Sequence, residues 1–124
     1  MAFTAELILK DGIVVNHDGT GPRDIAISGG RITGIGHFAA GQAGEVIDCT
    51  GLHILPGVID TQVHFREPGL THKEDLETGS RAAVLGGVTA VFEMPNTKPL
   101  TTTRDGLAAK VAAAHHRMHC DFAF

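Results

Sequence analysis

The sequence has 124 residues, contains no tryptophan and no tyrosine, and carries only six phenylalanines. Its core must therefore be built mainly from aliphatic side chains.

Cysteine is also scarce, because only Cys49 and Cys120 are present and they form no CxxC pair. We expect two buried free thiols in a cytoplasmic protein, with a structural disulfide as the alternative.

An excess of basic charge is absent as well. Ten Lys and Arg residues stand against 14 Asp and Glu residues, which gives a formal net charge of −4. Phosphate binding needs a concentrated basic surface, so we expect no nucleic-acid partner. The most apolar stretch, residues 52–59, is short and contains Pro56 and Gly57, so it cannot span a bilayer. Glu6 and Asp11 interrupt the N-terminus, which excludes a secretory signal, and we expect no membrane partner.

The first part of the chain has the pattern of short strands and turns. Asp11-Gly12 separates two apolar runs and predicts a turn, and Gly29-Gly30 predicts a β-hairpin. The predicted strands comprise residues 7–9, 13–15, 24–28, 31–33 and 45–49. No helical period occurs before residue 70. Residues 1–53 are therefore expected to form the N-terminal part of a small β domain.

The pattern changes at residue 54, where strands begin to alternate with helices. We expect strands at residues 58–65, 88–94 and 120–124, and helices from the Thr71-His72-Lys73-Glu74 capping box to Gly86-Gly87 and from Thr102-Thr103 to about His119. Short connections between strands and helices are typical of parallel βαβ units. A complete (β/α)₈ barrel needs about 250 residues. We therefore expect residues 54–124 to be the first βαβαβ portion of a barrel in a truncated chain.

The polar residues of the first barrel strand indicate chemistry. Alternate side chains of a strand share a face, so Asp60, Gln62 and His64 are predicted to point into the barrel. At the C-terminal end of a barrel strand such side chains line an active-site mouth. A spacing of two residues also lets two side chains bind the same metal ion.

Two motifs carry a resemblance to a known family. Residues 56–69, PGVIDTQVHFREPG, resemble the first barrel strand of the dihydroorotase family of the amidohydrolase superfamily, whose pattern is D-x-H-x-H-x-R-E-P-G. Residues 94–97, Met-Pro-Asn-Thr, resemble that family's M-P-N-T at the end of the second barrel strand. The resemblance implies an α/β fold, in which a small β-sandwich-like segment precedes the start of a (β/α)₈ TIM-type amidohydrolase barrel.

The same resemblance implies roles for individual residues. His64 matches the second histidine of a metal-binding pair, and Arg66 and Asn96 match residues that grip a substrate carboxylate. A guanidinium fork suits a carboxylate, and an amide adds a further donor. The implied cofactor is zinc, binuclear in the family. The remaining ligands and the catalytic aspartate would come from later strands, so none of these 124 residues is expected to be catalytic.

Gln62 departs from the pattern, because it occupies the place of the first histidine. An amide oxygen binds zinc less well than imidazole does, so the metal site is expected to be weakened, mononuclear, differently loaded or absent. His115 and His119 lie one helical turn apart, a spacing that would allow metal binding. We expect them instead to lie at a helix C-terminus, where the dipole favours positive charge.

The resemblance implies a metal-dependent enzyme that interconverts carbamoyl-aspartate and dihydroorotate in pyrimidine biosynthesis. Its substrate would be a small molecule with a carboxylate, and the complete protein would be a homo-oligomer. The 124-residue chain alone is expected to be inactive. Two alternatives remain open: another cyclic-amide hydrolase of the allantoinase or hydantoinase type, and a dihydroorotase-like scaffold that has lost its metal chemistry.

Overall fold

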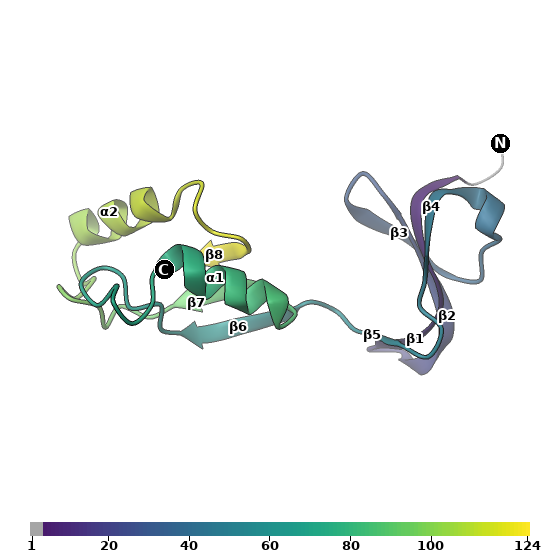
Figure 1. Ribbon diagram of the computed structural model, residues 1–124, viewed down its shortest axis with the longest axis horizontal. Coiled ribbons are helices and arrows are strands. Elements are labelled where there is room, and N and C mark those ends of the chain that lie inside the picture. Colours follow the sequence, from purple (N-terminus) through teal and green to yellow (C-terminus); the bar gives the residue numbers. More distant parts are fainter. Residues whose placement is uncertain (1–3) are drawn as a thin grey trace. The chain divides into compact units, whose positions relative to one another are not determined.

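The computed structural model describes residues 4–124, and the chain divides into two compact units, Met1–Pro56 and Gly57–Phe124. Figure 1 shows the helices and strands of both units. They are called unit 1 and unit 2. The expected domains, residues 1–53 and 54–124, remain a prediction about a longer protein. No helix within residues 4–124 has the length and apolar character needed to cross a membrane.

Unit 1 is a β-sheet with one short 3-10 helix. Its elements are β1 (Ala5–Asn16), β2 (Gly19–Ser28), β3 (Arg31–Gly36), η1 (Ala40–Gln42), β4 (Ala43–Asp48) and β5 (His53–Ile54). The strand order is β3-β2-β1-β4, and β5 also pairs with β1. β1, β2 and β3 are antiparallel, whereas β4 and β5 run parallel to β1. Ala5, Ile8 and Ala26 form the buried core.

The turn predicted at Asp11-Gly12 is wrong, because β1 runs through it as a single strand. Asp11 has a positive φ of 60°, and the register with β2 shifts between Leu9 and Gly12, so these residues form a β-bulge. The buried carboxylate of Asp24 accepts a hydrogen bond from the Asp11 N–H at 2.8 Å and holds the bulge in place. The hairpin predicted at Gly29-Gly30 is confirmed, since Ser28 pairs with Arg31 across it.

Unit 2 contains three parallel strands and two helices. Its elements are β6 (Val58–Val63), α1 (Leu76–Leu85), β7 (Val88–Glu93), α2 (Arg104–Ala114) and β8 (Asp121–Ala123). The strand order β6-β7-β8 follows the sequence, and both pairs are parallel. A helix connects each strand to the next (Figure 1). This is the βαβαβ arrangement with which a (β/α)₈ barrel starts, as the sequence predicts.

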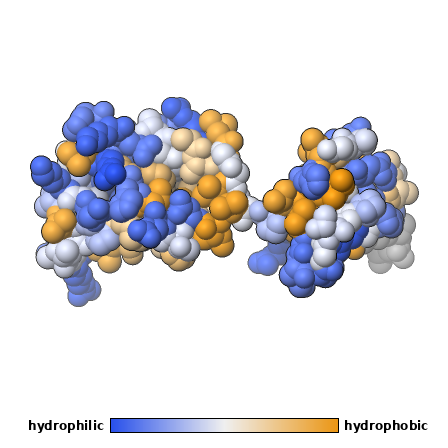
Figure 2. All heavy atoms as spheres, turned by 90° about the horizontal axis from the view of Figure 1, so that it is seen from below, coloured by the Kyte–Doolittle hydropathy of each residue, from blue (hydrophilic) through white to orange (hydrophobic). Residues whose placement is uncertain are grey.

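The core of unit 2 lies between the sheet and the helices. Phe65, Leu76, Val91 and Ala114 are its buried members. Phe92 follows Val91 and therefore lies on the opposite face of the sheet, where its side chain is 46% exposed. Apolar side chains also reach the surface of each unit in Figure 2. One face of the sheet is therefore covered by helices and the other is open.

Two helix boundaries differ from the prediction. Residues 71–73 form a turn, and α1 is capped instead by Asp75, whose carboxylate accepts the Thr78 N–H at 2.8 Å. In turn, the Asp75 N–H donates to the Thr78 hydroxyl oxygen at 3.2 Å, so the capping box is Asp-x-x-Thr. Thr103 caps α2, close to the predicted start.

The second helix also ends earlier than expected, at Ala114 and not near His119. His115 leaves the helical conformation, with φ −59° and ψ 126°, and His116 has φ 60°. These residues turn the chain towards β8, which begins at Asp121. Both cysteines are free thiols, and Cys49 is buried as expected whereas Cys120 is half-buried.

Candidate active site at the ends of strands β6 and β7

The carboxyl ends of β6 and β7 lie side by side. Val63, the last residue of β6, pairs with Glu93, the last residue of β7. One residue further on, the Met94 N–H donates to the Val63 carbonyl at 2.9 Å. The segments that follow the two strands therefore leave the sheet at the same edge. This confirms the sequence-based expectation that residues 58–65 and 88–94 contain adjacent parallel strands.

The structure brings two of the predicted site residues into contact at this edge. The imidazole Nδ1 of His64 lies 2.8 Å from the amide Oδ1 of Asn96. An amide oxygen only accepts hydrogen bonds, so Nδ1 carries the hydrogen in this contact. In a neutral imidazole with this hydrogen on Nδ1, the lone pair is on Nε2, which is the nitrogen left for a metal ion. His64 is half-buried, whereas Asn96 is exposed.

The strict alternation predicted from Asp60 to His64 is wrong. Asp60 pairs with Val91 and Val63 pairs with Glu93, so β6 has one residue more than β7 between these pairs. The Asp60 carboxylate accepts the Gln62 N–H at 2.9 Å and stabilises this bulge. Asp60 therefore lies on the same face as Val91, which packs against the helices. Gln62 is on the exposed part of the strand, next to Val63.

Arg66 follows the strand in an unusual backbone conformation. Its φ is 58°, in the left-handed region, and its carbonyl accepts the Leu70 N–H at 2.9 Å. Its half-buried side chain has no hydrogen bond or ion pair to any residue within 4–124. No hydrogen bond joins it to Asn96, so the structure brings His64 and Asn96 together but does not join Arg66 to them. The guanidinium donors are thus available to a ligand.

Glu67 is a structural anchor of the loop that carries Arg66. Its carboxylate accepts hydrogen bonds from both terminal nitrogens of Arg117, at 2.8 and 2.9 Å, and from the Leu76 N–H at 3.0 Å. The Arg117 guanidinium lowers the pKa of Glu67 below its ordinary value. Sequence reasoning missed Arg117, because a partner 50 residues away leaves no local signal.

The loops that follow β6 and β7 touch at Gly69. This glycine has φ 96°, and a Cβ added to it would lie 1.9 Å from the Lys98 carbonyl oxygen. The Lys98 N–H donates to the Pro68 carbonyl at 3.0 Å. Only a residue without a side chain allows this approach, so Gly69 fixes how close the two loops lie.

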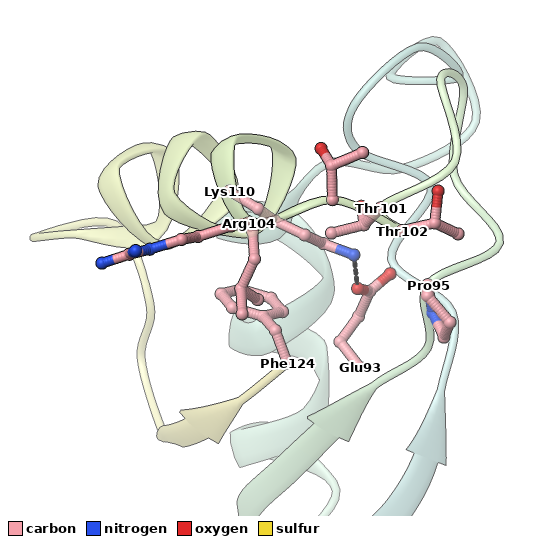
Figure 3. A pocket seen from close by; sticks show the side chains of 9 residues that line it. Glu93, Pro95, Thr101, Thr102, Arg104, Lys110 and Phe124 are labelled. Carbon is pink, nitrogen blue, oxygen red and sulfur yellow. Dashed lines mark ion pairs between the residues drawn. The ribbon is translucent and has the colours of Figure 1, made fainter.

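A buried ion pair lies on the helix side of β7. Lys110 of α2 pairs with Glu93, and each side chain is only 1% exposed. Figure 3 shows Lys110 reaching from the helix towards Glu93, while Arg104 points away. Lys110 also donates to the Met94 carbonyl at 3.3 Å. The pair borders a pocket of about 300 Å³ that also contains Phe124. Sequence reasoning missed this pair, although an acidic residue in an apolar strand was a usable signal.

The donor atoms near the strand ends fit only part of a metal shell. Within residues 4–124 no group of three or more His, Cys, Asp or Glu side chains is placed to hold a metal ion. His64 offers one imidazole nitrogen, Nε2, and the Gln62 amide oxygen is a poorer ligand for zinc. Near the end of α2, the ring centroids of His115 and His116 lie 3.8 Å apart, whereas His119 contacts Glu77 at 3.0 Å, so these three histidines of the described chain do not form a metal-binding group.

Comparison with known proteins agrees with this geometry. A family model described as dihydro-orotase-like matches residues 51–118. Allantoinases from Salmonella paratyphi B and Salmonella newport are each 43% identical to the chain over 119 residues, which is 95% of this chain and 26% of each relative.

Solved hydantoinase structures resemble the chain in the same way. The L-hydantoinase (dihydropyrimidinase) from Arthrobacter aurescens superposes with a TM-score of 0.86 and 34% identity, over 97% of this chain and 27% of that one. The D-hydantoinase from Bacillus sp. AR9 gives a TM-score of 0.81 with 31% identity, over 95% of this chain and 26% of that one. The chain therefore spans about a quarter of the length of these relatives. Motifs, fold and relatives agree that the chain belongs to the dihydro-orotase-like family.

Proposed function

We propose that these 124 residues form the N-terminal part of a metal-dependent hydrolase of cyclic amides. The observation that carries the proposal is the contact between His64 and Asn96 at the ends of adjacent parallel strands. Active sites of (β/α)₈ barrels lie at this end of the strands. The similarity to allantoinases and hydantoinases supports the same class of reaction.

For the substrate, we favour a cyclic amide that carries a carboxylate, such as dihydroorotate. Arg66 supports this choice, because its guanidinium has no partner among residues 4–124 and could bind a carboxylate through two hydrogen bonds. Asn96 uses its amide oxygen on His64, which leaves the amide N–H groups for a substrate oxygen. The second candidate substrates are allantoin and hydantoin, and the relatives found at 43% and 34% identity favour them.

His64 is the residue of this chain that would hold a metal, through Nε2, with Gln62 as a weaker second ligand. A bound divalent metal supplies a Lewis acid that polarises the amide carbonyl and activates water. The contributions of this chain are to orient the imidazole through Asn96 and to bind the substrate through Arg66. Gln62 also supports a different proposal, a scaffold without metal chemistry, because it weakens the site at one ligand position.

The test uses the full-length protein that contains these residues, loaded with zinc and assayed on dihydroorotate, allantoin and hydantoin. We expect hydrolysis of dihydroorotate, and Arg66→Met should reduce kcat/KM by about 10²-fold or more, since two charge-assisted hydrogen bonds are lost. Hydrolysis of allantoin that Arg66→Met leaves unchanged would identify the second candidate. A metal-loaded protein that hydrolyses none of the three would support the scaffold.

A further inference from the structure

We propose that Asn96 is a positioning residue for His64: its amide oxygen selects the ring tautomer that leaves Nε2 available to a metal. This inference rests on the proposed function, because it concerns the same site. It adds a role to the substrate contact that the motif resemblance implies for Asn96. The two roles use different atoms of one amide group, the oxygen for the ring and the N–H groups for the substrate.

The contact itself sets the chemistry. The distance of 2.8 Å between Nδ1 and Oδ1 is that of a well-formed hydrogen bond. A neutral imidazole carries one N–H and one lone pair, and the partner of one nitrogen decides the state of the other. Because the amide oxygen of Asn96 cannot donate, His64 carries its hydrogen on Nδ1. A free imidazole populates both tautomers, so the hydrogen bond to Asn96 favours one tautomer over the other.

The backbone on both sides of the contact is already fixed. Before it, the Met94 N–H donates to the Val63 carbonyl at 2.9 Å. After it, the Lys98 N–H donates to the Pro68 carbonyl at 3.0 Å. His64 and Asn96 lie in the two segments between these bonds. These two hydrogen bonds hold the two segments next to each other without any ligand.

The loop that carries Asn96 is also closed on itself. The buried Thr97 hydroxyl lies 2.8 Å from both the Pro99 carbonyl and the Thr101 hydroxyl. The Thr101 N–H donates to the Pro95 carbonyl at 2.9 Å. These bonds surround Asn96 in sequence and fix its backbone. The Asn96 side chain is therefore attached to a backbone that is held by hydrogen bonds, although the side chain itself is exposed.

Loss of the Asn96 amide oxygen should therefore change the orientation and tautomer of the His64 ring, and this change should in turn lower the metal affinity. Without a partner at Nδ1, His64 can rotate and can place its hydrogen on Nε2, which blocks the metal-binding nitrogen. Removal of such a partner from a metal-binding histidine typically costs about 10–100-fold in metal affinity. Asn96→Asp keeps an oxygen acceptor, whereas Asn96→Leu keeps a similar volume without one.

The direct test is the tautomer of His64 in the metal-free 124-residue chain, measured by long-range ¹H–¹⁵N correlation at a pH where the ring is neutral. We expect Nδ1–H in the wild type and in Asn96→Asp, and a majority of Nε2–H in Asn96→Leu. Asn16→Leu is the matched control, because Asn16 makes the corresponding contact with His17 at 3.1 Å in unit 1. It should leave His64 unchanged.

Dispersed amide signals from core residues Leu76 and Val91 establish that a variant is folded. A wild-type His64 that carries its hydrogen on Nε2 in the folded chain would overturn the inference even if Asn96→Leu does not fold. The same tautomer in folded wild type and folded Asn96→Leu would also overturn it. In the full-length protein, zinc affinity should fall about 10–100-fold in Asn96→Leu and less in Asn96→Asp.

The two proposals fail in different ways. The tautomer is measured without metal and without turnover, so the expected tautomers in a full-length protein that hydrolyses no cyclic amide would refute the proposed function and support the positioning role. Zinc binding that is insensitive to Asn96→Leu, in a full-length protein that hydrolyses a cyclic amide, would refute the positioning role and leave the proposed class of reaction standing.

Discussion

The carboxylate of Glu67 is held by the guanidinium of Arg117 through two parallel hydrogen bonds, at 2.8 and 2.9 Å, across 50 residues of sequence. Glu67 belongs to the loop after β6, and Arg117 follows α2. The same carboxylate accepts the N–H of Leu76, the first residue of α1. One side chain thus joins the start of one helix, the segment after the other, and the loop that carries Arg66.

We predict that Arg117→Gln lowers the free energy of unfolding of unit 2 by about 1–2 kcal/mol. Hydrogen bonds to charged groups contribute about 1.5–3 kcal/mol, and the 37% exposure of the Arg117 side chain reduces this through solvent screening. Urea unfolding followed by far-UV circular dichroism measures the change. Arg81→Gln is the control, since Arg81 pairs with Glu77 at 3.4 Å on the surface. Equal losses in both variants would contradict the prediction.

At acidic pH, Glu67 should no longer contribute to the free energy of unfolding of unit 2. The guanidinium of Arg117 lowers the pKa of this carboxyl from its ordinary value of 4.5, burial opposes the shift, and the Leu76 N–H adds to it. The contribution is therefore complete above about pH 4.5 and is lost as the pH falls through the lower pKa of the folded state. We expect the difference in urea midpoint between wild type and Glu67→Gln to shrink from pH 6 to pH 3. A difference that stays constant would refute this.

Gly69→Ala should destabilise unit 2 by about 2–4 kcal/mol. The substitution combines the cost of a side chain in the left-handed region with a clash against the Lys98 carbonyl oxygen. Urea unfolding gives the energy, and amide chemical shifts of residues 64–70 and 95–101 report whether the two loops separate. Gly86→Ala is the matched control in the same unit, because its added Cβ would lie 3.4 Å from the nearest atom, an ordinary contact. Similar losses in both would show that the loop contact is not specific.

In the full-length protein, Gln62→His should raise zinc occupancy and, with it, hydrolytic activity. Imidazole is a better zinc ligand than an amide oxygen, and Gln62 lies two residues before His64 at the end of β6. Elemental analysis gives the occupancy, and steady-state kinetics on dihydroorotate give the activity. Gln62→Asn retains an amide and should produce no gain. Full occupancy and full activity in the wild type would show that Gln62 does not impair the site.

The sequence predicted those features of the site that follow from local patterns. Two apolar runs with a helix between them predict neighbouring parallel strands, and polar residues at both strand ends then have to meet. His64 and Asn96 do meet, 32 residues apart in sequence. The hairpin at Gly29-Gly30 was predictable for the same reason, since the turn lies between the two strands that it joins.

The features that the sequence did not predict depend on distant partners. Asp11-Gly12 is compatible with a turn or with a bulge, and Asp24, more than ten residues away, stabilises the bulge. Asp60 does not follow the predicted alternation of side chains, because its carboxylate accepts a hydrogen bond from the Gln62 N–H and stabilises a bulge. A simple period of two along the strand does not predict such a bulge. The start of α1 depends on Asp75 as well as on Glu67, which approaches only in the folded unit.

The buried pair of Glu93 and Lys110 restricts how α2 can lie on the sheet. Lys110 and Ala114 are the only buried residues of this helix, so apolar packing alone distinguishes poorly between neighbouring placements. A shift of α2 by one turn would move the ammonium group about 5.4 Å along the helix axis and leave the carboxylate without a partner. A buried charge that loses its partner costs about 3–5 kcal/mol. We therefore expect the pair to disfavour wrong alignments of the helix and to make the native state single and well defined, with little added stability.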